Sequence, residues 1–286
     1  MGTLYVVATP IGNLDDLSPR AVRVLSDVSL IAAEDTRHTG RLLTRFGIET
    51  PMVSYHAFNE RARRDQLLAA LDAADVALVS DAGTPGIADP GQALVDTAFA
   101  AGHTVSPIPG ASSLTSAISV SGLIDGPFVV LGFLPRKGPE RARTMGVAAT
   151  CRLPVVLFEA PARLVATLRD LARTLGNRPA VVARELTKLH EEVRRDSLLN
   201  LVDRFERDRV RGEIVIVVGG PPPEELTEAA HDEAIAVVAA LLRSGLKPSE
   251  AAREAARITG RPRSDLYNLA RTLCIDGRTE SGGQSG

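Results

Sequence analysis

Short apolar runs alternate with segments of helical periodicity along the first half of the chain, and this alternation limits the possible folds. The runs expected to form buried strands are residues 3–8, 29–34, 52–55, 76–81 and 104–108. The segments between them place apolar residues three and four positions apart, which is the spacing of an amphipathic helix. Strand–helix–strand alternation therefore predicts a parallel sheet that is covered by helices.

The alternation breaks at residues 122–127, where we place a linker. Beyond it, further apolar runs and two clear helical segments predict a second α/β domain with a mixed sheet; the runs are 127–133, 153–160, 179–187 and 213–220, and the helices are 162–176 and 197–209. Residues 219–225 predict another linker, since three successive prolines cannot continue a strand or a helix. The expected parts are an N-terminal α/β domain (1–124), a second α/β domain (125–221), a helical C-terminal module (224–276) and a disordered tail (277–286).

Charge and cysteine content restrict the possible partners and compartments. The net charge is −2, so only a local basic surface could bind nucleic acid. One such surface is expected in the C-terminal module, where residues 243–278 contain eight Lys/Arg and four Asp/Glu, although a solvated helix face is the alternative. Cys151 and Cys274 show no disulfide or metal spacing, and no apolar run approaches membrane-spanning length, so we expect a cytoplasmic protein without a metal site.

Three loops after predicted strands are candidates for binding a cofactor, because ligands of open α/β sheets lie beyond the carboxyl ends of the strands. The first loop has one glycine, which disfavours the dinucleotides that a GxGxxG turn binds. The loop 80–91 contains three glycines together with Asp81 and Asp89, but it lacks the lysine of a triphosphate-binding loop. The third loop opens a helix with Ser112 and Ser113, where a carboxylate is favoured. A cofactor with an adenosine and an amino acid, such as S-adenosylmethionine, fits this set, although structural turns and caps are the alternative.

Two polar clusters follow the second and third predicted strands and form the candidate catalytic site. Residues 34–39, EDTRHT, follow the second strand, which is expected beside the first, and residues 54–60, SYHAFNE, follow the third. Loops held by buried strands frequently carry function, so the clusters are expected to supply a general base and a phosphate clamp. The candidate bases are Glu34, Asp35, His38, His56 and Glu60, and the candidate clamp is Arg37. Charge also follows the strand at 179–187, where Arg184, Glu185 and Lys188 could form ion pairs or line a cleft.

Eight blocks of sequence, in order along residues 4–220, resemble the tetrapyrrole-methylase-like superfamily. The blocks are LYVVATPIGNLDDLSPRA, IAAEDTRHTGRLL, SYHAFNE, ALVSDAGTPGIADPG, PGASSLTSA, GFLPRK, FEAPARL and ARELTKLHEE. The EDTRHT, SYH–NE and RELTK pieces resemble most closely its ribosomal branch, the small-subunit ribosomal RNA cytidine 2′-O-methyltransferases. Each short piece is weak alone, and the ordered set is specific.

The resemblance implies a homodimer that methylates ribosomal RNA, free or in the small subunit, with S-adenosylmethionine in a cleft between two α/β domains and a helix-turn-helix-like module at the C-terminus. The implied cofactor contacts are Pro10, Ile11, Gly12, Asp81, Ala82, Gly83, Thr84, Ile87, Ser112, Ser113, Phe158, Arg184 and Leu186. The catalytic residues would come from Glu34, Asp35, Arg37, His38 and Glu60. The alternatives are a tetrapyrrole C-methyltransferase and a non-catalytic RNA-binding protein of ribosome assembly.

Overall fold

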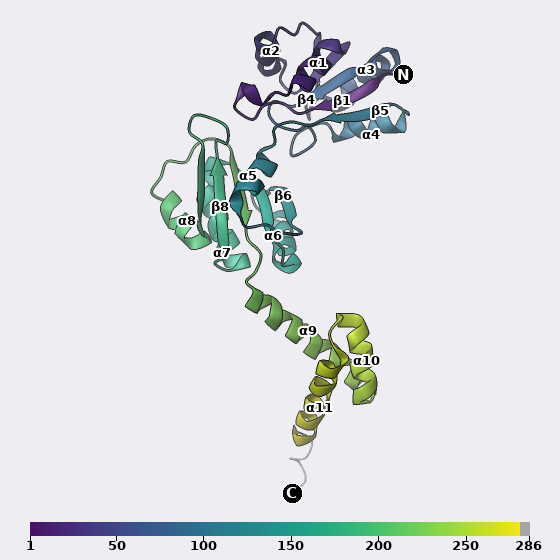
Figure 1. The fold of residues 1–286 in the computed structure, drawn as a ribbon, viewed down its shortest axis with the longest axis vertical. Helices are drawn as coiled ribbons and strands as arrows, with labels where there is room; N and C mark the ends of the chain where they lie inside the picture. Colours follow the sequence, from purple (N-terminus) through teal and green to yellow (C-terminus); the bar gives the residue numbers. More distant parts are fainter. Residues whose placement is uncertain (281–286) are drawn as a thin grey trace. The chain divides into compact units, whose positions relative to one another are not determined.

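The computed structural model describes the backbone of residues 1–280, and the side chains of all of these except 151, 223–230 and 274–280. Two compact units make up the chain, residues 1–220 and 221–286. The first unit contains two five-stranded sheets, and the second is helical (Figure 1). The predicted fold class is confirmed. One α/β part has a parallel sheet, the next has a mixed sheet, and helices follow them.

The first sheet is parallel throughout. Its strands are β1 (Thr3–Val7), β2 (Leu30–Ala33), β3 (Met52–Ser54), β4 (Val76–Val79) and β5 (Thr104–Ile108), in the order β3-β2-β4-β1-β5. The expectation that β2 lies beside β1 is wrong, because β4 pairs with both and separates them. All four residues of β4 are buried, which suits a strand at the centre of a sheet that is covered on both faces.

Helices cover both faces of this sheet because successive strand residues point to opposite sides. Helices α1 (Pro19–Asp27) and α2 (Thr36–Arg45) pack on the face that contains Val7 and Ile31. Helices α3 (Glu60–Ala73) and α4 (Gln92–Ala100) pack on the face that contains Leu4 and Leu78. A short 3-10 helix, η1 (Leu14–Asp16), precedes α1, and α5 (Ser113–Ser121) follows β5.

The second sheet is mixed, as predicted. Its strands are β6 (Val129–Phe133), β7 (Val155–Glu159), β8 (Pro179–Arg184), β9 (Glu192–Ser197) and β10 (Ile214–Val218), in the order β6-β7-β10-β8-β9, and only β6 and β7 pair in parallel. One face packs on α6 (Pro139–Cys151), α7 (Leu164–Leu175) and α8 (Leu198–Phe205), with η2 (Pro161–Arg163) leading into α7. The other face packs on α5, which comes before residue 124, and the domain boundary at that residue stays a prediction.

The second unit is built from three helices, α9 (Pro223–Arg243), α10 (Pro248–Thr259) and α11 (Arg263–Glu280), around a core that includes Ala234, Ala252 and Leu266. The linker expected at 219–225 ends earlier, because proline is tolerated in the first turn of a helix and α9 begins at the third proline. α11 extends to Glu280 and so overlaps residues 277–280 of the tail expected at 277–286, which stays a prediction. Residues 281–286 lie outside the described residues. Within the described part, no helix is long and apolar enough to span a membrane.

Candidate active site

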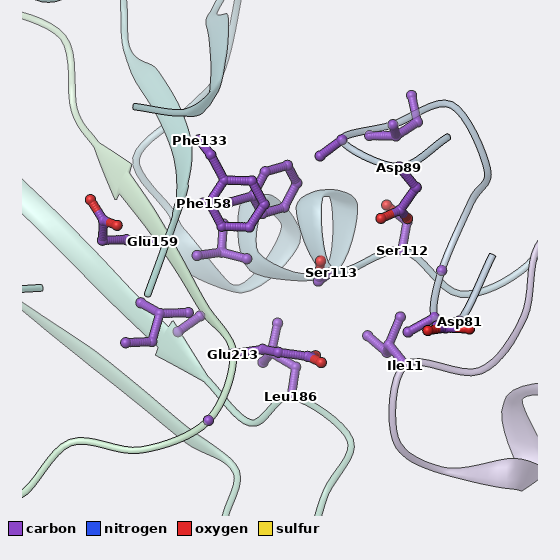
Figure 2. Close-up of a pocket in the computed structure, with 18 of the residues that line it drawn as sticks. Ile11, Asp81, Asp89, Ser112, Ser113, Phe133, Phe158, Glu159, Leu186 and Glu213 are labelled. Atoms are coloured by element: carbon purple, nitrogen blue, oxygen red, sulfur yellow. The ribbon is translucent and has the colours of Figure 1, made fainter. Parts of the chain in front are cut away.

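A cavity of about 460 Å³ lies in the first unit, where strand ends of both sheets meet (Figure 2). The sequence-predicted residues that line it are Ile11, Glu34, Asp81, Ala82, Gly83, Thr84, Ile87, Ser112, Ser113, Phe158 and Leu186. The predicted residues that do not line it are Pro10, Gly12, Asp35, Arg37, His38, Glu60 and Arg184. The first sheet contributes the loops after β1, β2, β4 and β5, so the expected carboxyl-end site is present.

The loop after β1 is fixed from two sides, and this explains Gly12. Thr9 and Gly83 exchange backbone hydrogen bonds of 2.8 and 3.0 Å, which join the loops after β1 and β4. The backbone N–H of Asn13 donates to Thr187 Oγ1 at 3.1 Å, in the loop after β8. A Cβ on Gly12 would collide with the Lys188 side chain, so only glycine permits this approach. Ile11 is thereby turned into the cavity (Figure 2).

The cluster after β2 separates into a pocket residue and a helix cap. Asp35 is the N-cap of α2, accepts from the Arg37 N–H at 2.8 Å, and pairs with the Arg37 guanidinium at 3.0 Å. These contacts hold the pKa of Asp35 at about 2, which makes it a weak base. Arg37 and His38 lie in the first turn of α2, because the cap starts the helix at Thr36, and neither lines the cavity.

Glu34 is the candidate base that lines the cavity. Its Oε2 accepts from the Asp81 backbone N–H at 3.2 Å, and Asp81 Oδ1 accepts from the Asp35 N–H at 3.0 Å. This reciprocal pair locks the ends of β2 and β4 together. Burial is the largest cause that raises the pKa of Glu34, and the neighbouring Asp81 charge adds to it. A carboxylate with a raised pKa at the mouth of a cavity is suited to accept a proton.

The cavity is acidic. Glu34, Asp81, Asp89, Glu159 and Glu213 line it, while its described lining includes no Lys, Arg or His. Burial raises the pKa of Asp89 to about 6, and the charge of Glu34 contributes. In Figure 2, Asp81 and Asp89 lie together with Ile11 and Ser112 on one side of the cavity. Glu213 lies on the other side, beside Leu186. Such a cavity favours a ligand that carries positive charge.

An aromatic pair forms the apolar wall opposite the aspartates. The Phe133 and Phe158 rings, from the ends of β6 and β7, have centroids 5.3 Å apart (Figure 2). Ile11 and Leu186 belong to the apolar cluster that includes Phe158. Phe133 and Glu213 were missing from the sequence-predicted site. The GFLPRK block could have indicated Phe133, but no local pattern shows that the antiparallel β10 brings the chain before it, 212–213, to this edge.

The loop after β8 carries local backbone strain. Glu185 and Thr187 have φ of 49° and 67°, values that non-glycine residues seldom adopt, and they flank the pocket residue Leu186. Lys188 holds this loop through ion pairs with Glu185 at 2.9 Å and with Glu213 at 3.3 Å. The sequence left two interpretations of this charged segment, ion pairs or the lining of a cleft. Arg184 forms an ion pair, with Glu192, and does not line the cavity.

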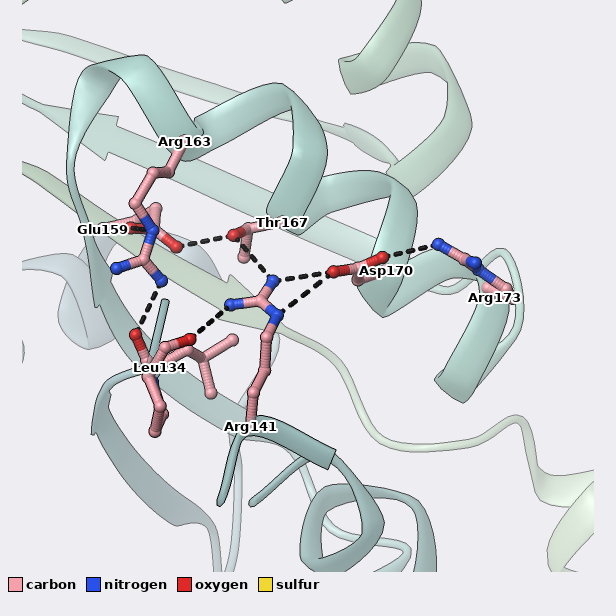
Figure 3. Close-up of polar contacts among 8 residues, drawn as sticks. Leu134, Arg141, Glu159, Arg163, Thr167, Asp170 and Arg173 are labelled. Atoms are coloured by element: carbon pink, nitrogen blue, oxygen red, sulfur yellow. Dashed lines mark hydrogen bonds and ion pairs between the residues drawn. The ribbon is translucent and has the colours of Figure 1, made fainter. Parts of the chain in front are cut away.

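A buried polar network supports the wall after β7 (Figure 3). The Glu159 side chain is fully buried, pairs with Arg163 at 3.1 Å and accepts from the Thr167 hydroxyl at 2.6 Å. Arg141 donates to Thr167 at 3.2 Å and pairs with Asp170 at 2.7 Å. The two arginines also donate to the carbonyls of 134 and 135, at 2.6 and 3.1 Å. The network therefore fixes the loop 134–138 directly after Phe133, including the exposed Arg136 and Lys137.

Comparison with protein families gives two matches along the chain. Residues 3–202 match the family described as Tetrapyrrole (Corrin/Porphyrin) Methylases. Residues 228–273 match the RsmI C-terminal HTH domain, in agreement with the expected helix-turn-helix-like module. The first match includes the cavity-lining residues up to Leu186 but not those at 212–215, and the second lies in the helical unit.

Curated relatives carry one name, ribosomal RNA small subunit methyltransferase I. The protein from Synechocystis sp. is 47% identical over 279 residues, which cover 97% of this chain and 100% of its own length. The protein from Pseudomonas aeruginosa is 45% identical, with 94% and 96% covered. The protein from Thermotoga maritima is 43% identical over 219 residues, which cover 76% of this chain and 98% of its own length.

Solved structures show the same fold at low identity. A uroporphyrin-III C-methyltransferase from Thermus thermophilus complexed with S-adenosyl homocysteine has a TM-score of 0.53 at 18% identity, covering 77% of this chain and 97% of its own. A diphthine synthase has a TM-score of 0.58 at 17% identity, covering 77% and 90%. These likenesses establish the fold, and the sequence matches above establish the relationship. The chain belongs to the tetrapyrrole (corrin/porphyrin) methylase family, in the branch whose members are named ribosomal RNA small subunit methyltransferase I.

Proposed function

We propose that this chain methylates the ribose 2′-oxygen of a cytidine in small-subunit ribosomal RNA, with S-adenosylmethionine as the methyl donor. The observation that carries the proposal is the acidic cavity at the strand ends of both sheets, in a chain whose relatives at 39–47% identity are named for the small ribosomal subunit. The choice of ribose and of cytidine comes from the resemblance of the EDTRHT, SYH–NE and RELTK blocks to the ribosomal branch.

The cavity fits S-adenosylmethionine by shape and by charge. Its carboxylates Asp81, Asp89 and Glu213 suit a ligand that carries a sulfonium and an ammonium group. The Phe133–Phe158 wall suits a flat adenine ring. The side chain of Ser112 makes no capping hydrogen bond to α5, so the first-turn N–H groups there are available to the ligand carboxylate.

The proposed cofactor contacts are the ten sequence-predicted lining residues other than Glu34, together with Asp89, Phe133 and Glu213. Pro10 and Gly12 would act by shaping the loop that presents Ile11, and Arg184 by holding the edge of the second sheet through Glu192. When bound, S-adenosylmethionine supplies an electrophilic methyl group on a sulfur that leaves without further activation.

Glu34 is the proposed general base. A carbon–oxygen bond forms at the ribose 2′-oxygen while the sulfur–methyl bond breaks, and the hydroxyl proton passes to the Glu34 carboxylate. Holding the two reactants in line contributes roughly 7–11 kcal/mol, and a positioned base contributes about 10²–10⁴-fold. The hydrogen bond from the Asp81 N–H fixes one oxygen of Glu34 and leaves the other free to accept the proton.

RNA binding would depend on local basic groups, because the net charge is −2. The exposed Arg136 and Lys137 lie on the loop that the buried network fixes, and Arg37 exposes 88% of its side chain at the first-sheet edge. The basic residues of the helical unit would add to these. A homodimer, which the resemblance implies, would present each patch twice, and the enzyme would act in the cytoplasm on the RNA or on the assembled subunit.

The test is methyl transfer from labelled S-adenosylmethionine to small subunits from a strain that lacks this protein, followed by mapping of the label. Label on the 2′-oxygen of one cytidine is the expected result. The Glu34→Gln variant should bind the cofactor normally and lose about 10²–10⁴-fold in turnover.

Three results would contradict parts of the proposal. Cofactor binding without label on subunits or naked RNA would favour a tetrapyrrole substrate. RNA binding without cofactor binding would favour the non-catalytic assembly protein. Turnover of Glu34→Gln within a few-fold of the wild type would remove Glu34 as the base.

A further inference from the structure

The most exposed aromatic side chain of the described part lies in the loop after β3, beside the loop after β2 that carries Glu34. Phe58, in the loop between β3 and α3, exposes 99% of its surface. Aromatic residues are only 3% of this chain, and a large apolar side chain that is held in water is unfavourable without a partner. Single exposed apolar side chains are common on protein surfaces, so a role for Phe58 depends on the turn that holds it and on its neighbours.

The loop that carries Phe58 is a rigid turn, so its exposure is built into the fold. The Asn59 side chain accepts from the His56 N–H at 2.8 Å and donates to the Ser54 carbonyl at 3.1 Å. The Asn59 backbone N–H also donates to the His56 carbonyl at 2.8 Å. The His56 ring lies edge-on to the Phe58 ring, with centroids 6.1 Å apart at 64°. One edge contact steadies the Phe58 ring and leaves its surface open for stacking.

The turn follows β3 and so lies at the carboxyl ends of the first sheet's strands, where the cavity also lies. β3 pairs in parallel with β2, so the loops after the two strands are neighbours. Glu34, directly after β2, lines the cavity, and His56, in the loop after β3, contacts the Phe58 ring. Phe58 and the proposed base therefore lie on neighbouring loops, after β3 and after β2.

The surroundings of Phe58 carry cations. Arg61, Arg63 and Arg64 lie in the first two turns of α3, directly after the loop. Arg64 pairs with Asp65 at 3.3 Å, and Arg61 is exposed and forms no ion pair with the described residues. Arg37, which pairs with Asp35, lies in the first turn of α2, after the neighbouring strand β2. An exposed aromatic ring among arginines matches a single-stranded nucleic acid, whose bases stack and whose phosphates pair with cations.

We propose that Phe58 is a stacking platform for an unpaired base of the substrate RNA, beside the nucleotide whose ribose enters the cavity. The inference rests on the proposed function for the identity of the RNA. Stacking on one ring holds a base without reading its edges, so Phe58 would set affinity and register, while the cavity performs the transfer.

The test compares four single variants in the full chain, with small subunits as substrate and with a short single-stranded RNA that contains 2-aminopurine as a binding probe. Phe58→Ala and Phe58→Leu should raise KM for the subunits and Kd for the probe by about 5- to 150-fold, the range for loss of one stacked base. Phe58→Trp should stay near the wild type, because it keeps the ring. Wild type and Phe58→Trp should quench 2-aminopurine, and the other two should not.

Phe99→Ala is the matched control. Phe99 is 61% exposed and lies near the end of α4, which leads to the start of β5 at the opposite edge of the same sheet. The Phe99→Ala variant should leave KM, the probe Kd and the 2-aminopurine quenching unchanged. All four variants should bind S-adenosylmethionine as the wild type does, since neither phenylalanine lines the cavity. Equal KM and probe Kd for Phe58→Ala and Phe99→Ala would overturn the stacking platform. Failure of the wild type to methylate any RNA would overturn the proposed function, and the probe Kd would still decide the role of Phe58.

Discussion

At the scale of single residues, the ionisation of Asp89 connects the cavity to its ligand. Its pKa is raised by burial from 3.8 to about 6, so the folded chain holds this proton more firmly than the unfolded chain does. The stability that the proton gives is fully present below about pH 4 and is lost as the pH rises through about 6. Above that pH a buried negative charge remains, and a cationic ligand would stabilise it.

We predict that affinity for S-adenosylmethionine increases from pH 5 to pH 7, and that affinity for S-adenosylhomocysteine, which lacks the sulfonium charge, increases less. Asp89→Asn should flatten the difference and raise the free energy of unfolding at pH 8 by about 1 kcal/mol, allowing for partial solvent screening. Calorimetric titration and urea denaturation measure the two effects. The same pH profile for both ligands would contradict this role of Asp89.

Residue types near strand ends could be predicted from the sequence, but their individual roles could not. Glu34 and Asp35 are adjacent acids after the same apolar run, and one lines the cavity while the other caps α2. The difference depends on the direction in which the chain turns after β2, and that turn is set by the Asp81 contacts from a distant strand. Local pattern contains no information about such a partner.

At the scale of elements, the network around Glu159 joins β7, α6 and α7 and fixes the wall of the site. Removing one member of a buried ion pair leaves the other charge without a partner in a low-dielectric place. Arg163 faces the fully buried Glu159, whereas Arg173 faces Asp170 from a side chain that is 75% exposed. The two arginines are therefore a natural comparison within one network (Figure 3).

We predict that Arg163→Leu lowers the free energy of unfolding by about 2–4 kcal/mol, and that Arg173→Leu lowers it by no more than about 1 kcal/mol. Urea denaturation of both variants checks the difference. The Arg163 variant should also bind RNA less tightly, because the carbonyl before Pro135 loses its donor and the loop with Arg136 is loosened. Equal destabilisation by the two changes would mean that Glu159 does not need its partner.

The apolar strands could be predicted from the sequence, but the strand β9 and the helix α6 could not. β9 reads EVRRDS and is largely exposed, so it forms only because the edge of β8 offers it hydrogen bonds. α6 contains few large apolar residues and buries mainly Met145 and Ala148. The central strands are strongly apolar and carry their own signal, whereas edge elements depend on neighbours that are distant in sequence.

At the scale of the whole molecule, the division at Gly220 separates the cavity from the helical unit. The Thermotoga maritima relative matches over 219 residues, 98% of its length, which is close to the 1–220 of the first unit. That relative carries the same name as the longer ones. The helical unit would then contribute affinity more than chemistry.

We predict that a chain truncated after residue 223 binds S-adenosylmethionine as the full chain does and keeps its turnover at saturating RNA. Its affinity for RNA should fall, and the dependence of that affinity on salt should weaken by about 0.7–0.9 in logarithmic slope for each phosphate contact that is lost. Filter binding across a salt series, with calorimetry for the cofactor, gives both values. Unchanged RNA affinity would show that the basic residues of the helical unit are a solvated surface.

The acidic lining described above also has a consequence for selection among metabolites. In a cell, the adenosine-containing compounds that compete for such a cavity are mostly nucleotides, with several negative charges on the part that would face Asp81, Asp89 and Glu213. Shape alone discriminates poorly between ligands that share an adenosine, whereas like charges in a confined site repel strongly. We therefore expect the carboxylates to disfavour ATP and related nucleotides, so that the scarcer, positively charged S-adenosylmethionine can occupy the cavity.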